Sequence, residues 1–239
     1  MREPFHYLGP PGPCVYLPGL TQRMEYVVAP GVTGQQYLNA MHVGWRRFGE
    51  TLFRPRCFDC RACLSLRVDV ARFQPDRSQK RARKANLGRT RLEIGTPSVD
   101  PDKLALHHSF HRFQEHDKGW PEASEDSDSY IDSFINNPFP TEEWCYFLED
   151  RLVGVGYVDR LGDGLSGIYF FHDPAHRELS LGTWNVLSLI RRAADLALPH
   201  VYLGYYVAGC RSLEYKARFV PNEILSPEGT WVPHLGPRD

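Results

Sequence analysis

The sequence has no apolar run that approaches the roughly 18 residues needed for a membrane-spanning helix. Its first residues, Met1 to His6, also lack the apolar core of a signal peptide. No internal repeat is visible. We therefore expect a cytoplasmic protein with no membrane partner, and neither a transmembrane nor a repeat architecture.

The net charge is close to zero, because the chain has 28 Lys and Arg and 29 Asp and Glu. The balance hides a split along the chain. Residues 1–91 hold 16 basic and 6 acidic residues, whereas residues 92–239 hold 12 and 23. This asymmetry favours a basic first half that contacts a polyanion such as a nucleic acid. The alternative is that the two halves neutralise each other across an internal interface.

Three cysteines lie close together in a C-x2-C-x2-C pattern, Cys57, Cys60 and Cys63, and Cys14 lies upstream. In a chain expected to stay in the cytoplasm, such spacing indicates a metal site rather than disulfides. Four thiolates suffice for tetrahedral zinc or for an iron–sulfur cluster. The alternative is that they are structural thiols without a metal.

The segment 77–91 holds seven Lys or Arg and no acidic residue. Asp76 is placed to cap a helix over 77–86, which Gly88 would end. That helix would carry basic side chains around most of its surface, with little left to bury. A solvated linker is the alternative to a nucleic-acid contact. The candidates for phosphate contact are Arg77, Lys80, Arg81, Arg83 and Lys84.

Hydrophobic periodicity predicts the remaining elements. Helices are expected over 37–48, 104–118, 124–137 and 180–198, and strands over 64–73, 144–149, 152–160, 165–171 and 200–206. Hairpin, strand, helix and strand follow one another in the second half, which resembles the GNAT acyltransferase fold. We therefore predict an α+β protein. A GNAT-like domain over 93–239, with a mixed sheet and flanking helices, would follow a small, basic, cysteine-containing domain over 1–92.

The turn before the long helix decides which donor this fold would use. In GNAT proteins a Gln/Arg-x-x-Gly-x-Gly/Ala turn and the helix N-terminus bind the coenzyme A pyrophosphate. Arg177 and Gly182 match, but Ser180 replaces the first glycine, and its Cβ disfavours positive φ. Glu178 would also repel a pyrophosphate. Alternatively, Ser180 is only an N-cap. An aminoacyl-tRNA would suit both the basic half and the altered turn, because its ester is already activated.

Several blocks then match one family in the right order. They are Pro13–Gly19, Gly44–Gly49, Phe53–Cys63, Phe73–Arg81, Ser180–Thr183, Tyr202–Cys210 and Tyr215–Phe219. The chain resembles the arginyl-tRNA–protein transferase family, in particular its bacterial aspartate/glutamate leucyltransferase branch. The resemblance spans about 13–222, nearly the whole chain.

The resemblance implies transfer of an amino acid from a charged tRNA to the N-terminal α-amine of proteins that begin with Asp or Glu. The product would carry a destabilising N-terminal residue and enter an N-degron degradation route. The bacterial branch implies leucyl-tRNA as the donor, whereas eukaryotic relatives use arginyl-tRNA. The transfer itself would require no cofactor.

Aminoacyl transfer to an amine needs little acid–base catalysis from the protein. The acceptor α-amine has a pKa near 7.7–8, so a strong general base is not obligatory. Stabilisation of the oxyanion should contribute most of the catalysis. The candidates are Ser180, Gly182, Thr183, Tyr205 and Tyr215, although each tyrosine could instead be a packing residue.

An acidic N-terminal side chain needs a cationic partner. The candidates are Arg46, Arg47, Arg54, Lys216 and Arg218, any of which could instead contact the tRNA acceptor stem. His107, His108 and His111 are interpreted as surface or core residues rather than metal ligands.

Two other functions stay open from the sequence. One is a conventional GNAT acetyltransferase that uses acetyl-CoA and carries a zinc-ribbon module. The other is a non-catalytic, zinc-dependent RNA-binding protein. A metal-dependent hydrolase is disfavoured, since no His-rich open site is evident.

Overall fold

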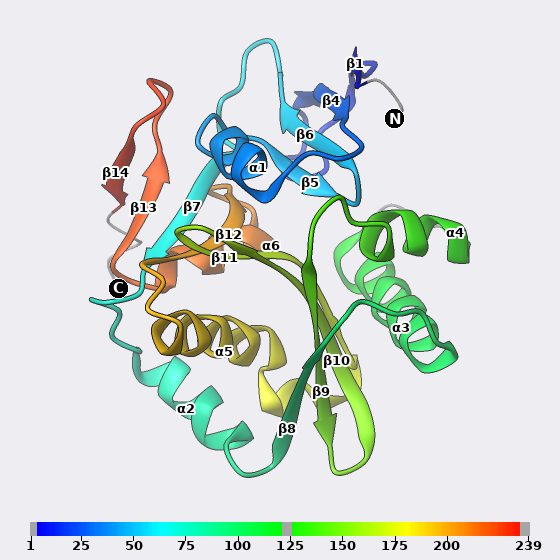
Figure 1. Ribbon diagram of the computed structural model, residues 1–239, viewed down its shortest axis with the longest axis vertical. Coiled ribbons are helices and arrows are strands. Elements are labelled where there is room, and N and C mark those ends of the chain that lie inside the picture. Colours follow the sequence, from blue (N-terminus) through cyan, green and yellow to red (C-terminus); the bar gives the residue numbers. More distant parts are fainter. Residues whose placement is uncertain (1–3, 121–125, 235–239) are drawn as a thin grey trace.

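The computed structural model describes residues 4–120 and 126–234. Its centre is an eight-stranded mixed sheet with helices on both faces (Figure 1), which confirms the α+β class. The strand order is β14-β13-β7-β12-β11-β10-β9-β8. These strands are β7 (Leu64–Asp69), β8 (Thr90–Gly95), β9 (Thr141–Leu148), β10 (Arg151–Leu161), β11 (Gly164–His172), β12 (His200–Tyr206), β13 (Asn222–Leu225) and β14 (Trp231–His234).

One pair of neighbouring strands, β11 and β12, runs parallel, and its ladder is short. It covers three residue pairs, from Gly164–His200 to Ser166–Tyr202, although β11 continues to His172. The crossover between the two strands runs through a 3-10 turn, η2 (Pro174–Leu179), and α5 (Leu181–Asp195). The two parallel strands therefore pair only over their first three residues and are not paired beyond that point.

Side-chain alternation along the strands divides the core between the two faces. In β9, Trp144 and Tyr146 belong to the cluster that contains the buried residues of α5. Cys145, between them, belongs to the cluster that contains Leu106 and Phe110 of the opposite helix. Each face of the sheet thus has its own apolar core.

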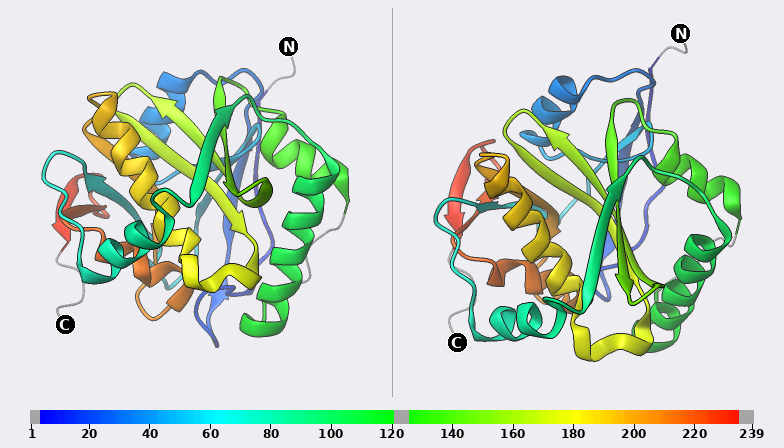
Figure 2. Two further views of the ribbon diagram at one scale, coloured as in Figure 1. Left: turned by 90° about the horizontal axis from the view of Figure 1, so that it is seen from below. Right: turned by 60° about the horizontal axis from the view of Figure 1, so that its bottom comes forward.

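Helices cover these two faces (Figures 1 and 2). On one face lie α5 and α2 (Arg77–Asn86). On the other lie α3 (Pro101–Lys118), α4 (Ser127–Tyr130) and a π-helical turn, η1 (Ile131–Ile135). Two short segments, α6 (Arg211–Glu214) and η3 (Tyr215–Arg218), follow β12. Among the described residues, no helix is both long enough and apolar enough to cross a membrane.

A second, four-stranded sheet is built from the first part of the chain. Its order is β1-β4-β6-β5, with β1 (Phe5–Leu8), β4 (Met24–Val28), β5 (Arg46–Phe48) and β6 (Thr51–Pro55). A two-stranded ribbon, β2 (Gly12–Pro13) and β3 (Thr21–Gln22), lies in the same region. Helix α1 (Gly34–Met41) begins at a Thr33–Gln36 capping box, and its Tyr37 and Leu38 pack with Leu161 and Tyr202 of the large sheet.

The structure corrects two predicted helices. The segment 37–48 was expected to be one helix, but α1 ends at Met41 and β5 begins at Arg46. Gly44 between them has φ +90°, a conformation that breaks a helix and that glycine adopts readily. The expected helix over 124–137 is α4 followed by η1, and residues 124–125 lie outside the described residues.

The large sheet also crosses the boundary expected at residue 92. Strand β7, from the first half, pairs with β12 and β13 of the second half. The separate N-terminal sheet agrees with a distinct first region, but that region ends before β7. A division into domains over 1–92 and 93–239 stays a prediction about independent folding.

Candidate functional site

The turn before α5 has the conformation of a tight backbone loop. Ser180 has φ +50° and ψ +48°, which is left-handed, and its side chain makes no capping hydrogen bond. Ser180 thus adopts the positive φ that its Cβ disfavours, and the alternative in which its hydroxyl caps α5 was wrong. Gly182, in the first turn of α5, has open space where a Cβ would stand. Backbone N–H groups of a first helical turn are free for an anionic ligand.

Helix α2 is attached to this turn through its buried face. The Asn86 side-chain amide donates to the Leu179 carbonyl at 2.6 Å, immediately before Ser180. At the other end of α2, the Gln79 amide donates to the Arg218 carbonyl at 3.0 Å. The helix was expected to have little to bury, yet Gln79, Ala82 and Asn86 are all buried. Helix α2 therefore bridges two segments of the candidate site.

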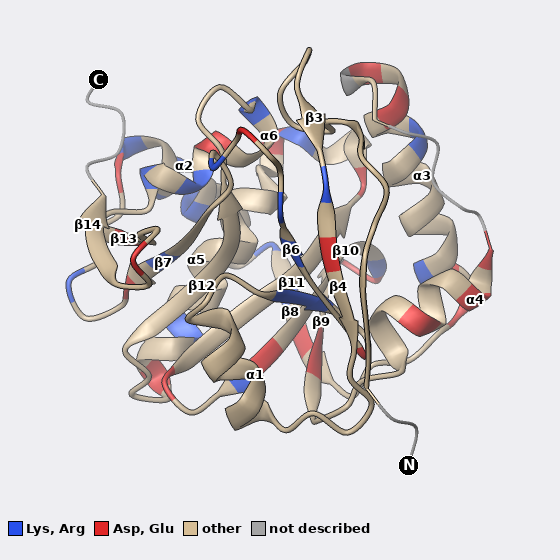
Figure 3. Ribbon diagram, turned by 90° about the horizontal axis from the view of Figure 1, so that it is seen from above, with Lys and Arg blue, Asp and Glu red and all other residues tan. Residues whose placement is uncertain are grey.

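The opposite face of α2 carries the basic residues (Figure 3). Five cations there are exposed, and no ion pair of theirs is found within residues 4–120 and 126–234: Arg77, Lys80, Arg81, Arg83 and Lys84. The Asp76 cap and the end at Asn86 agree with the sequence prediction, and Gly88 follows with φ +78°. The helix thus presents an unneutralised basic surface beside the Ser180 turn.

The two candidate tyrosines have different surroundings. Tyr205 is 7% exposed, and its hydroxyl donates to the Gly44 carbonyl at 2.8 Å. Burial raises the pKa of this phenol well above its ordinary value. Tyr215 is 37% exposed, with its ring 6.4 Å from that of Phe219. Tyr205 therefore serves to join the first half of the chain to β12.

Three of the five cations proposed for an acidic substrate already have carboxylate partners. Arg47 forms a fully buried ion pair with Asp159. Arg54 contacts Glu25 at 2.6 Å, and Arg218 contacts Asp76 at 3.0 Å. These three side chains hold parts of the fold together.

Arg46 and Lys216 have no carboxylate partner within the part of the chain that the structure describes. Arg46 is 6% exposed; its Nη1 donates to the Trp45 carbonyl at 2.6 Å, whereas Nε and Nη2 have no partner. Lys216 Nζ donates to the Tyr205 carbonyl at 2.9 Å. Burial, and then the charge of Arg46, lower the pKa of Lys216 to about 7, although Cys210 acts in the opposite direction.

The four cysteines of the candidate metal site line one pocket, Cys14 from the connection between β2 and β3, and Cys57, Cys60 and Cys63 from the loop after β6. The Leu17 N–H donates to Cys14 Sγ at 3.4 Å. Within the described residues, however, no three His, Cys, Asp or Glu side chains lie close enough together to hold an ion. The residue types fit a metal site, but their separation does not.

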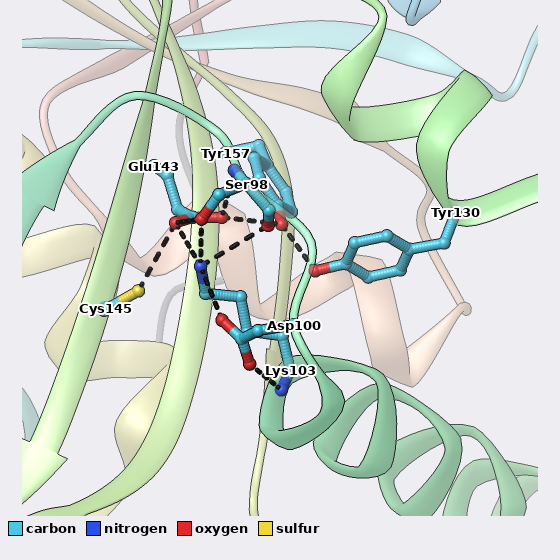
Figure 4. Close-up of polar contacts among 7 residues, drawn as sticks. All are labelled: Ser98, Asp100, Lys103, Tyr130, Glu143, Cys145 and Tyr157. Atoms are coloured by element: carbon cyan, nitrogen blue, oxygen red, sulfur yellow. Dashed lines mark hydrogen bonds and ion pairs between the residues drawn. The ribbon is translucent and has the colours of Figure 1, made fainter. Parts of the chain in front are cut away.

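A buried polar network between α3 and the sheet was not found from the sequence (Figure 4). Glu143 accepts hydrogen bonds from Lys103 Nζ at 2.6 Å and from the Tyr157 hydroxyl at 3.1 Å, and Tyr130 continues the chain. Lys103 is 6% exposed and Glu143 is 4% exposed. Glu143 shares a face of β9 with Cys145, so the alternation along that strand could have shown that an acid enters the core.

The histidines of α3 agree with the sequence interpretation. His107 is buried, and its burial, with the neighbouring His111 and His108, lowers its pKa to about 3. The imidazole of His111 lies 2.9 Å from the Tyr169 hydroxyl. Both belong to the aromatic core under α3.

Comparison with known proteins identifies the family. The family described as arginine-tRNA-protein transferase, C terminus, matches residues 102–226, more than half of the chain. The corresponding N-terminal family matches residues 12–81. The chain belongs to the arginine-tRNA-protein transferase family. The N-terminal family region holds Arg46 and the four cysteines, and the C-terminal region holds the Ser180 turn and Lys216.

Curated relatives in this family are similar over most of their length. An aspartate/glutamate leucyltransferase of Campylobacter jejuni is 38% identical over 216 residues, 89% of this chain and 89% of the relative. One of Sphingopyxis alaskensis is 36% identical over 95% of this chain and 91% of the relative. Among solved structures, L-PGS from Bacillus licheniformis gives a TM-score of 0.48 at 10% identity, covering 72% of this chain and 58% of that chain, a likeness too low to support a conclusion.

Proposed function

We propose that this member of the arginine-tRNA-protein transferase family transfers leucine from leucyl-tRNA to the N-terminal α-amine of proteins that begin with Asp or Glu. Membership of the family, with full-length similarity to relatives named aspartate/glutamate leucyltransferase, is the observation that carries the proposal. The product proteins would enter an N-degron degradation route in the cytoplasm.

The reaction exchanges an ester for an amide. The neutral α-amine attacks the carbonyl carbon of the aminoacyl ester, and a tetrahedral oxyanion forms. Its collapse breaks the bond to the ribose oxygen, which takes up a proton as the tRNA leaves, while the amine nitrogen loses one. Because the ester is already activated, placing the two substrates and stabilising the oxyanion are the protein's main tasks. No cofactor enters these steps.

We assign the donor end to the Ser180 turn. The N–H groups around Gly182 and Thr183 open the first turn of α5, and the ladder between β11 and β12 ends at Ser166–Tyr202. Strands that separate beside a helix N-terminus are typical of a GNAT-like acyl-transfer site, which supports this assignment. Tyr205 holds the site in shape rather than reacting, because its hydroxyl is bonded to Gly44.

We assign the tRNA phosphates to the exposed face of α2. Its unneutralised cations suit a polyanion, and Asn86 and Gln79 fix the helix between the Ser180 turn and the 215–219 segment. A tRNA acceptor stem bound along α2 would place its aminoacylated end near that turn. The other members of the catalytic set, Ser180 and Tyr215, would line the same region.

Separately, we propose that Cys14, Cys57, Cys60 and Cys63 hold a structural zinc ion or iron–sulfur cluster. Their residue types and their shared pocket support this, and the thiols would have to come closer together than they lie in the structure to share one ion or cluster. Metal analysis of protein purified without oxygen should find a stoichiometric metal that a Cys60→Ser variant loses. Wild-type protein without metal after such purification contradicts the proposal.

Labelled transfer tests the main proposal. Leucyl-tRNA and arginyl-tRNA would be offered in turn with peptides that begin with Asp, Glu, Lys or Ala. We expect leucine on the Asp and Glu peptides alone. Arginine on the same peptides would keep the reaction and replace the donor. Transfer from neither, with tight binding of acetyl-CoA, would favour an acetyltransferase and contradict the proposal.

A further inference from the structure

Two of the cations in the candidate site, Arg46 and Lys216, have no carboxylate partner among the described residues, and Arg46 is also buried. Arg46 leaves Nε and Nη2 unpartnered in the interior, and Lys216 contacts only the Tyr205 carbonyl among the hydrogen bonds of the described residues. The guanidinium of Arg46 lies over the Tyr205 ring, 5.5 Å from its centroid. One tyrosine therefore positions both cations, through its ring and through its backbone oxygen.

Such an arrangement is unfavourable without a ligand. Removing a charge from water without pairing it is unfavourable, and a second charge of the same sign nearby adds repulsion. The other three arginines of the set, at 47, 54 and 218, each avoid this penalty with a carboxylate. The two unpartnered donors of Arg46 call for an explanation, and an anionic ligand between Arg46 and Lys216 would provide one.

We propose that Arg46 and Lys216 form the pocket for the carboxylate of the acceptor's first residue, and that they set the preference for Asp and Glu. This inference rests on the proposed transfer reaction and selects two of its five candidate cations. Lys216 keeps part of its surface exposed and contacts the carboxylate first, while Arg46 offers two N–H donors from the interior.

A small carboxylate fits this pair better than a nucleic-acid phosphate does. The tRNA backbone is long and is matched by the exposed cations of α2, whereas Arg46 is enclosed and can serve only one small group. The two cations also come from the two family regions of the chain, so the pocket forms only when both regions are folded together.

Peptide binding without tRNA tests the pocket independently of transfer. Dissociation constants would be measured by calorimetry for a peptide that begins with Asp and for the same peptide beginning with Asn. We expect wild-type protein to prefer Asp. Lys216→Met should weaken Asp-peptide binding about 100-fold, to the level of the Asn peptide, as when one partner of a buried charge pair is lost.

A variant of Arg46 and a control variant complete the binding test. Arg46→Lys, which retains the charge but loses the forked donors, should weaken Asp-peptide binding about 10-fold. Arg72→Gln, whose arginine is exposed and already paired with Asp69, should keep the full preference for Asp. Thermal unfolding would verify that each variant is folded.

The outcomes are distinguishable from those of the transfer assay. Equal binding of the two peptides to the wild type overturns the pocket, as does a Lys216→Met variant that keeps the preference. Loss of tRNA affinity in that variant, with peptide binding intact, would assign the pair to a phosphate and also overturn it. Preferential Asp binding without any transfer would support the pocket and contradict the proposed reaction alone.

Discussion

The ion pair between Arg47 and Asp159 links the N-terminal sheet to β10, and both side chains are completely buried. Asp159 also accepts a hydrogen bond from Thr141 at 3.0 Å. Breaking such a pair leaves an uncompensated charge in the interior. Arg47→Met should therefore lower the free energy of unfolding by about 3–5 kcal/mol, measured by urea denaturation.

An exposed pair provides the matched control for that stability measurement. Arg72 contacts Asp69 at 2.7 Å, but its side chain is 67% exposed. Arg72→Met should change the free energy of unfolding by no more than about 0.5 kcal/mol. Equal losses in the two variants would mean that burial of the Arg47–Asp159 pair does not govern its contribution.

Titration of Lys216 should make the rate of transfer to an acidic acceptor peptide depend on pH. Its pKa is lowered to about 7 by burial and by Arg46, so it loses its proton as the pH rises through that region. If it binds the acceptor carboxylate, kcat/KM for an Asp peptide should contain a factor that falls as pH rises through about 7.

The acceptor α-amine titrates in the opposite sense, because only its neutral form attacks. That effect is common to wild type and to Lys216→Met, so the ratio of their kcat/KM values isolates the lysine. The titratable and charged groups that act on Lys216 are Arg46 and Cys210. A ratio that stays constant from pH 6 to pH 8.5 would contradict a charged Lys216 in acceptor binding.

Helix α2 is the element expected to bind tRNA. Changing Lys80, Arg81 and Lys84 to Ala should weaken tRNA binding and reduce its salt dependence by about one unit of log–log slope per lost contact. The cause is that fewer counterions are released from the phosphates. Filter binding across a series of salt concentrations would measure both quantities.

The control replaces three exposed cations on other elements, Arg160, Arg191 and Arg211, with Ala. Both triple variants remove three positive charges, but only one of them removes charges from α2. Should both triple variants lose the same affinity and slope, the attraction would be due to net charge rather than to α2.

The turn before α5 stores backbone strain in Ser180. An L-residue in the left-handed region is disfavoured by about 1–2 kcal/mol, part of which glycine recovers. Ser180→Gly should raise the free energy of unfolding by up to about 1 kcal/mol. Ser180→Ala keeps the Cβ and loses a hydroxyl that caps nothing, so it should show no such gain. A larger increase in the free energy of unfolding for Ser180→Ala than for Ser180→Gly would show that the backbone at Ser180 is not strained.

At the scale of the whole molecule, the first and second halves of the chain share one architecture. Strand β7 enters the large sheet between β12 and β13, and Tyr205, Arg47 and Arg46 join the N-terminal sheet to the second half. The charge split seen along the sequence is therefore partly internal, as with Arg47 and Asp159, and partly external, as on α2. Neutralisation across an internal interface is thus confirmed for Arg47 and Asp159, whereas contact of the α2 cations with a nucleic acid stays a prediction.

Local signals in the sequence predicted much of the fold. The Asp76 cap and the basic run predicted α2, and alternation predicted the strand that begins at Leu64, although β7 ends at Asp69 rather than at residue 73. The predicted helix over 37–48 failed because burial of Arg46 and Arg47 in a strand depends on partners far along the chain. Periodicity detects apolar faces, but it does not show where a charged side chain is buried.

The sequence indicated which segments form the candidate site, but not which side chains in them have structural partners. The sequence named Arg46 and Lys216 together with three arginines that have structural partners. The three structural arginines, Arg47, Arg54 and Arg218, are recognised only by their carboxylate partners. These partners, Asp159, Glu25 and Asp76, lie 112, 29 and 142 positions away along the sequence. The network around Glu143 was missed for the same reason, since Lys103 lies 40 positions away.

Mass spectrometry of a peptide beginning with Asp, after incubation with the protein and leucyl-tRNA, tests N-terminal aminoacyl transfer directly. We expect a gain of one leucyl residue, which fragmentation places on the α-amine, and no gain when that amine is acetylated beforehand. An unchanged Asp peptide, or leucine attached to a side chain of the acetylated one, would contradict aminoacyl transfer to the N-terminus.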